Sequence, residues 1–123
     1  MPSYVALTYT ADVDWSAPEQ AEEMAEYAEF GQAAAAVIRG GTVLYPTATA
    51  TTVRVRGGKG GEVVASDGPY AETKEVLTGF YALDCADLDE AIAVAARIPA
   101  AWSGGGAVEV RPVLEHEAGG AGA

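Results

Sequence analysis

Hydrophobic and polar residues alternate along several segments of this chain, and elsewhere apolar residues recur at helical spacing. Residues 3–10, SYVALTYT, place Val5, Leu7 and Tyr9 on one side of an extended segment. Such alternation predicts a β-strand. Because the residues between them are also largely apolar or aromatic, we expect this strand to be buried on both faces.

A helix is predicted from Pro18 to about Arg39, with Ser16 as its cap. Small and apolar residues recur there at spacings of three and four, which gives one stripe: Met24, Tyr27, Gly31, Ala34 and Ile38. The glycine pair at 40–41 is expected to end this helix. Its five glutamates predict a solvated opposite face.

The rest of the chain alternates strand signals with a second helix. Strands are expected at residues 42–46, 49–56, 62–66, 79–85 and 107–114, with GGKGG at 57–61 as a hairpin tip. Asp87 and Glu90 form an acidic capping box. The helix that follows has a buried stripe of Leu88, Ala91, Ile92 and Ala95, and Pro99 is expected to stop it.

This order of elements predicts the split βαβ pattern of a ferredoxin-like α+β sandwich. Two helices cover only one face of such a sheet, yet the strands carry apolar and aromatic residues on both faces. A second sheet packed across a twofold axis would cover the other face, so we expect a homodimer. We expect one domain over residues 1–115 and a flexible tail over 116–123.

Composition excludes several classes of protein. The 123 residues carry a net charge of −11 with only seven basic residues, which argues against a nucleic-acid partner. The chain contains no apolar run near the roughly 20 residues of a membrane-spanning helix. The N-terminus lacks the basic and apolar regions of a signal peptide, and the single Cys85 excludes an intrachain disulfide, so we expect a cytoplasmic location.

The segment SDGPYAETKE, residues 66–75, is richer in polar groups than a turn requires. Asp67, Gly68 and Pro69 have the chemistry of a corner. That corner is either purely structural or holds Tyr70 at the mouth of a pocket.

Glu72, Thr73 and Lys74 follow within the same segment. They form a surface ion network of little energetic value, a pocket rim, or a latch that holds a partner subunit across a dimer. Glu72 is the acid–base candidate, provided that burial or a like charge raises its pKa.

Three of the seven basic residues, Arg54, Arg56 and Arg111, lie on predicted strands. Arginine binds carboxylates in a planar, bidentate fashion, which favours a small anionic ligand. Pairing with Glu62 or Glu109 across strands is the alternative. Tyrosines at the cavity between facing sheets would supply apolar surface with a polar tip: Tyr4, Tyr9, Tyr45 and Tyr81.

The sequence has no Cys/His set for a metal, no phosphate-binding glycine motif and no set of nucleophile, histidine and acid. We therefore expect no cofactor. His116, the sole histidine, falls in the tail and is expected to be exposed and non-catalytic.

DGPYAETKE, followed by GFYALDCADLDEAIAVAARIPAAW and VEVRPV, resembles the DGPF-domain branch of the YCII-related proteins from Tyr4 to Val113. Tyr70 replaces the phenylalanine of the branch's name. The resemblance implies a dimeric α/β barrel and no settled activity. The wider family is similar to enzymes acting on small cyclic compounds through a His–Asp pair, which this chain lacks. The branch's association with extracytoplasmic-function sigma factors implies a regulatory role.

Three functions therefore stay open. The first is a small-ligand-binding or regulatory protein, and the second is a metal-independent enzyme of proton-transfer or lyase type acting on a small cyclic or aromatic compound. The third is an accessory partner of a sigma factor.

Overall fold

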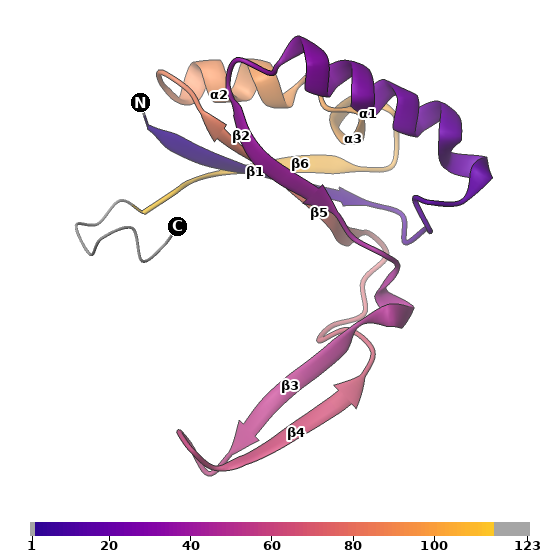
Figure 1. Ribbon diagram of the computed structural model, residues 1–123, viewed down its shortest axis with the longest axis vertical. Coiled ribbons are helices and arrows are strands. Elements are labelled where there is room, and N and C mark those ends of the chain that lie inside the picture. Colours follow the sequence, from indigo (N-terminus) through magenta and orange to yellow (C-terminus); the bar gives the residue numbers. More distant parts are fainter. Residues whose placement is uncertain (1, 115–123) are drawn as a thin grey trace.

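A computed structural model describes residues 2–114, which form a four-stranded antiparallel sheet, helices on one of its faces and a projecting hairpin (Figure 1). The strands are β1 (Ser3–Thr10), β2 (Ile38–Val43), β3 (Thr51–Arg56), β4 (Glu62–Asp67), β5 (Val76–Asp84) and β6 (Ala107–Pro112). The helices are α1 (Ala21–Ala33), α2 (Leu88–Ala95) and α3 (Pro99–Trp102), with 3₁₀ turns η1 (Pro18–Gln20) and η2 (Thr47–Thr49). The predicted tail and His116 lie outside the described residues.

The main sheet has the strand order β2-β5-β1-β6, and every neighbouring pair is antiparallel. Apart from the inserted hairpin, this is the split βαβ arrangement of a ferredoxin-like α+β fold, as the sequence predicts. Alternation along β1 turns Ala6 and Thr8 toward the helices, whereas Val5 and Leu7 face the other way. The sheet therefore has a covered face and an open face.

The core lies between the covered face and the helices. Ala6, Leu83 and Ile98 are fully buried there, and Phe30 of α1 packs beside them. Complete burial of a leucine such as Leu83 contributes about 1.5–3 kcal/mol. Among residues 2–114, no helix has both the length and the apolarity to cross a membrane.

The first helix is shorter than its apolar stripe predicts. It ends at Ala33, and Ile38 belongs to β2, where it pairs with Leu83 of β5. Sheet pairing of the β-branched Ile38 prevails here over local helical spacing. The glycines at 40–41 accordingly lie within β2 and do not end a helix.

Two further boundaries differ from the prediction, and one agrees with it. Ser16 is not a cap: its N–H and hydroxyl both donate to Asp14, and η1 begins after Ala17 with no side-chain cap. Pro99 begins the short helix α3 instead of only ending α2. The capping box at Asp87 is confirmed, since Glu90 N–H donates to Asp87 Oδ1 at 2.9 Å.

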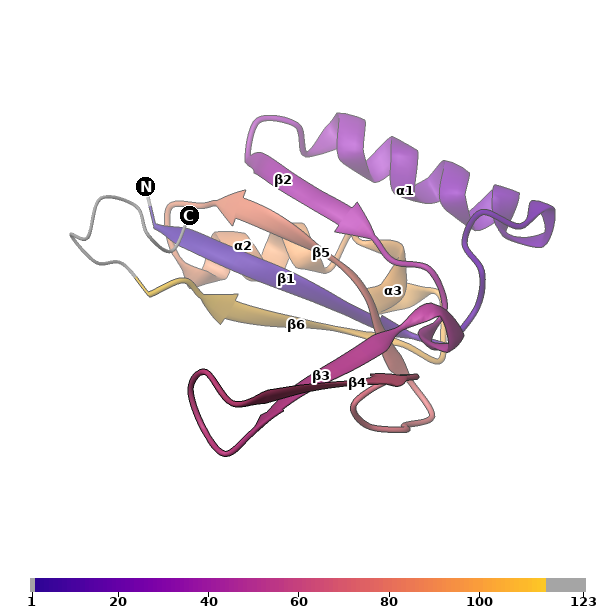
Figure 2. The same cartoon turned by 60° about the horizontal axis from the view of Figure 1, so that its bottom comes forward.

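The hairpin formed by β3 and β4, residues 51–67, will be called the arm. Within residues 2–114 its strands pair only with each other, and it stands on the side of the main sheet opposite the helices (Figures 1 and 2). Three glycines near its tip, at 57, 58 and 60, have positive φ angles, a conformation that glycine adopts without strain. The GGKGG tip that the sequence predicts is thus present.

Candidate functional site

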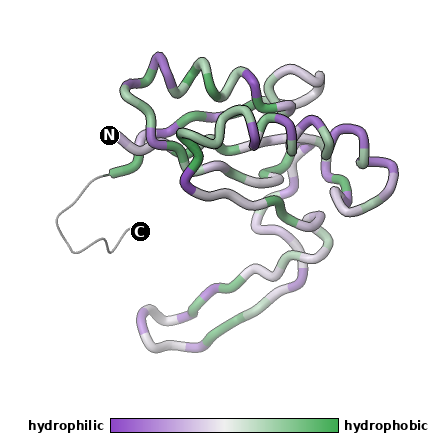
Figure 3. Tube along the Cα trace, turned by 45° about the horizontal axis from the view of Figure 1, so that its top comes forward, coloured by the Kyte–Doolittle hydropathy of each residue, from purple (hydrophilic) through white to green (hydrophobic). Residues whose placement is uncertain are grey.

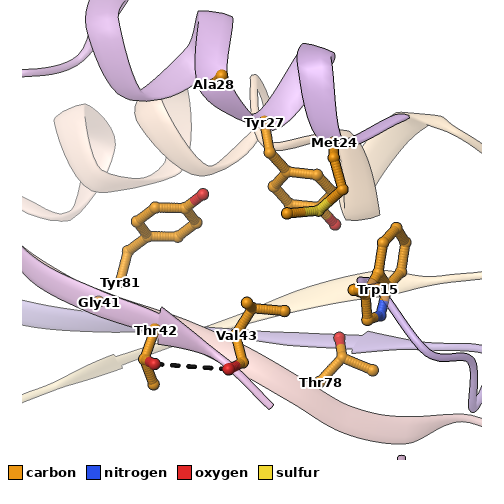
Figure 4. A pocket seen from close by; sticks show the side chains of 9 residues that line it. All are labelled: Trp15, Met24, Tyr27, Ala28, Gly41, Thr42, Val43, Thr78 and Tyr81. Carbon is orange, nitrogen blue, oxygen red and sulfur yellow. Dashed lines mark hydrogen bonds between the residues drawn. The ribbon is translucent and has the colours of Figure 1, made fainter. Parts of the chain in front are cut away.

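A cavity of about 300 Å³ lies between α1 and the covered face of the sheet (Figure 4). We call it the inner pocket. Side chains of α1 reach down into it, and β2 and β5 form its floor. Its lining consists of Trp15, Met24, Tyr27, Ala28, Gly41, Thr42, Val43, Thr78 and Tyr81.

Trp15 closes one end of the inner pocket from the loop after β1. The residue is only 7% exposed, and its ring meets that of Tyr27 edge to face, with centroids 5.7 Å apart. Within the described part of the chain, its buried Nε1 has no hydrogen-bond partner. A buried N–H in this state is rare and costs about 1–3 kcal/mol.

Buried threonines lie beneath this end of the pocket. Thr8, Thr10 and Thr78 come from β1 and β5, and their hydroxyls join one another at 3.2–3.3 Å. Thr8 also donates to the carbonyl of Gly79 at 3.0 Å. The hydroxyls of the cluster therefore satisfy one another. Thr78 belongs both to this cluster and to the lining of the inner pocket.

The pKa values of both tyrosines of the inner pocket are raised. Burial, reinforced by the nearby Glu23 carboxylate, raises the pKa of Tyr27 to about 12. Burial also raises the pKa of Tyr81, whose ring packs edge to face on Phe30 at 5.1 Å. At neutral pH both hydroxyls are neutral groups able to donate or accept hydrogen bonds. None of the nine lining residues is charged.

The segment 66–75 begins at the base of the arm. Gly68 has a φ of +102°, so the corner at residues 67–69 needs glycine. Its N–H donates to the carbonyl of Ala50, and its own carbonyl accepts from Thr52 Oγ1, both at 2.8 Å. These bonds fix Asp67, Gly68 and Pro69 against the start of β3.

Glu72 and Thr73 line a second hollow of about 390 Å³, outside the helix-covered core. Its walls also include Asp12 and Thr47. Thr47 donates to Asp12 through both its hydroxyl and its N–H, and these bonds lower the pKa of the Asp12 carboxyl. We call this the outer hollow. Lys74 is exposed on the same segment.

The predicted arginines do not converge on one point. Arg54 of the arm lies over the ring of Tyr70. Arg56 pairs with Glu62 at 3.8 Å. This ion pair is the cross-strand pairing that was the alternative to an anion site. Arg111 on β6 stands opposite Val5. Val5 lies five residues along β1 from the end nearest segment 66–75, a separation of roughly 17 Å.

Among the tyrosines predicted to line a cavity between two sheets, Tyr4 and Tyr81 face the helices instead. Tyr4 does so through the regular alternation of β1. For Tyr81, the bulge opposite Thr8 and Tyr9 shifts the alternation of β5, so that Thr78 and Tyr81 both turn toward the helices.

The most informative pocket residues carry little signal in the sequence. Trp15 sits in a loop without periodicity, and Thr78 becomes notable only because the fold buries it. Met24 and Tyr27 were visible as part of the helical stripe. Asp12 gave no signal, because its partner Thr47 lies 35 residues away.

The fold and the inner pocket define a ferredoxin-like α+β protein with a cavity beneath its first helix. The chain belongs to the YCII-related family, whose domain model matches residues 3–117. An uncharacterized protein of Rhizobium meliloti (strain 1021) is 46% identical over 76 residues. This similarity spans 62% of the present chain and 59% of the relative's length.

Proposed function

We propose that this YCII-related protein, as a member of the DGPF branch, binds a small neutral aromatic or cyclic compound in the inner pocket. The observation that carries the proposal is the buried Trp15 Nε1, which has no partner in the described residues and belongs to a residue lining an apolar cavity. A hydrogen-bond acceptor on a ligand would offset the desolvation of that N–H.

The lining favours a particular class of ligand. About 300 Å³ is near the lower limit of ligand pockets and suits a compound of one ring. Aromatic and apolar side chains suit an apolar ring, and the hydroxyls of Tyr27, Tyr81 and Thr78 suit neutral polar groups. Because the lining has no cation, transfer of a carboxylate into it would be costly. The predicted anionic ligand would therefore bind at the exposed arginines and not in the inner pocket.

Binding is favoured over proton transfer at this site. Tyrosines with raised pKa values are poor bases at neutral pH. The enzymatic alternative would use Glu72, the predicted acid–base residue, in the outer hollow. The sigma-factor partnership would use the protein surface, such as the exposed glutamates of α1, and stays a prediction.

We also propose a homodimer in which the open sheet faces meet. Leu77 and Phe80 lie on the open face at 40% and 37% exposure, beside Val5 and Leu7. A contiguous apolar face of this kind is typical of an interaction surface.

The pocket is tested by NMR titration of the indole N–H signals. The chain has two tryptophans, and Trp102 Nε1 already donates to the carbonyl of Arg97. Acetophenone presents a ring and a carbonyl acceptor, whereas ethylbenzene is a matched ring without an acceptor. We expect acetophenone to shift the Trp15 signal and leave that of Trp102 in place. In Trp15→Phe, acetophenone binding should weaken about two- to tenfold, the value of one hydrogen bond.

Ethylbenzene should bind the wild type and Trp15→Phe with equal affinity, because both keep an aromatic wall. If neither compound shifts the Trp15 signal at millimolar concentration, the pocket does not take neutral single-ring ligands. If Trp15→Phe loses both ligands equally, Trp15 acts through shape and not through its N–H.

A further inference from the structure

The arm exposes an apolar surface that the described part of the chain leaves uncovered. Val53, Val55 and Val63 are 61%, 47% and 68% exposed. The cross-strand register places Val55 opposite Val63 and Val53 opposite Ala65, so these side chains share one face of the hairpin. Figure 3 shows the hydrophobic stretches of the arm well away from the core. We call this the valine face.

The other face of the arm is used within the chain. Arg54 stacks on Tyr70 there, and Arg56 pairs with Glu62. A two-stranded hairpin alone is marginally stable in water. The valine face is therefore the side on which the arm lacks packing.

We propose that the valine face docks on a second copy of this chain, so that the hairpin is a dimerisation arm. This inference rests on the homodimer proposed above and adds to it the element that fastens the two copies. The arm stands on the same side of the sheet as the open face (Figures 1 and 2). A second copy packed on the open face would lie between the main sheet and the arm. It would contact both the open face and the arm.

Symmetry and charge favour a second copy as the occupant. Across a twofold axis each arm reaches the other subunit, so the same contact forms twice. The arm carries Arg54, Arg56 and Lys59 against Glu62 and Asp67, a net charge of +1, on a chain whose total is −11. The arm is thus a part of the chain that can approach another strongly acidic copy without repulsion.

The test measures self-association by sedimentation velocity across a dilution series of the whole chain. Val63→Glu changes the valine face, and Ile92→Glu places the same charge on an exposed apolar site of α2, at 52% exposure against 68% for Val63. We expect the wild type and Ile92→Glu to form dimers with equal Kd. Val63→Glu should raise the Kd roughly a hundredfold, because the symmetry repeats the lost contact. Circular dichroism should show unchanged folding in all three proteins.

A third variant, Leu77→Glu, separates the two inferences because it alters the open sheet face and leaves the arm intact. If Leu77→Glu weakens the dimer while Val63→Glu does not, the sheet faces meet without the arm and the arm proposal is wrong. A wild type that is monomeric at every concentration overturns both. Acetophenone binding in the inner pocket is read out separately, so failure of either dimer inference leaves that test unaffected.

Discussion

The guanidinium carbon of Arg54 lies 5.1 Å from the centroid of the Tyr70 ring. The contact joins the middle of β3 to the segment that follows the arm. Tyr70 is 76% exposed, and this stacking helps to order its side chain. The Arg54–Tyr70 stacking occupies the charged face of the arm. The valine face, on the opposite side, therefore remains open for a partner.

Replacing Tyr70 should loosen the arm without unfolding the main sheet. An exposed cation–π contact is worth about 0.5–1 kcal/mol. We expect Tyr70→Ala to increase amide hydrogen exchange in β3 and β4 about two- to fivefold, whereas Tyr70→Phe, which keeps the ring, should match the wild type. Equal exchange in Tyr70→Ala and Tyr70→Phe would mean that the stacking does not order the arm.

The cap of α2 gives a stability prediction. Asp87 Oδ1 accepts from Glu90 N–H, and Glu90 Oε1 accepts in turn from Ala86 N–H at 2.6 Å. Asp87→Ala should lower the free energy of unfolding by about 1 kcal/mol, whereas Asp87→Asn should cost less because asparagine also caps helices well. Urea denaturation monitored by circular dichroism measures both. A loss in Asp87→Asn as large as in Asp87→Ala would indicate that charge, and not the hydrogen bond, stabilises the helix.

The sequence predicts the elements whose pattern is local. Alternation reveals β1 and the arm strand β3, and the capping box reveals the start of α2. The end of α1 was misplaced because Ile38 fits the helical stripe equally well, and only its pairing with Leu83 decides for a strand. A turn motif such as GGKGG predicts a hairpin, but its projection from the sheet depends on tertiary pairing.

The inner pocket is harder to predict for the same reason. Trp15 and Thr78 are distant in sequence, and neither belongs to a motif. Their proximity follows from where β1 ends and how β5 pairs with it. Segment 66–75, in contrast, stands out by composition, and the structure places Glu72 and Thr73 at a hollow. Its role in binding or catalysis remains a prediction.

Asp12 should contribute an acid-sensitive part of the stability. Its two hydrogen bonds from Thr47 lower its folded-state pKa below 3.8. The contribution is therefore fully present above pH 3.8 and is lost as the pH falls through the folded-state pKa. Between pH 5 and 2, the free energy of unfolding should fall less steeply in Asp12→Asn than in the wild type. Identical slopes in urea denaturation series would show that the Thr47 contact has no energetic weight.

Tyr27 should contribute stability that is lost in alkali. Its pKa is raised to about 12, first by burial and then by Glu23, whereas an unfolded chain has a tyrosine pKa near 10. The contribution is fully present below pH 10 and is lost as the pH rises toward 12. The free energy of unfolding should thus fall less steeply over this range in Tyr27→Phe than in the wild type. Tyr45→Phe, which removes an exposed hydroxyl, is the matched control and should follow the wild type. If Tyr27→Phe also follows the wild type, the Tyr27 hydroxyl is solvated and the inner pocket is wetter than its lining indicates.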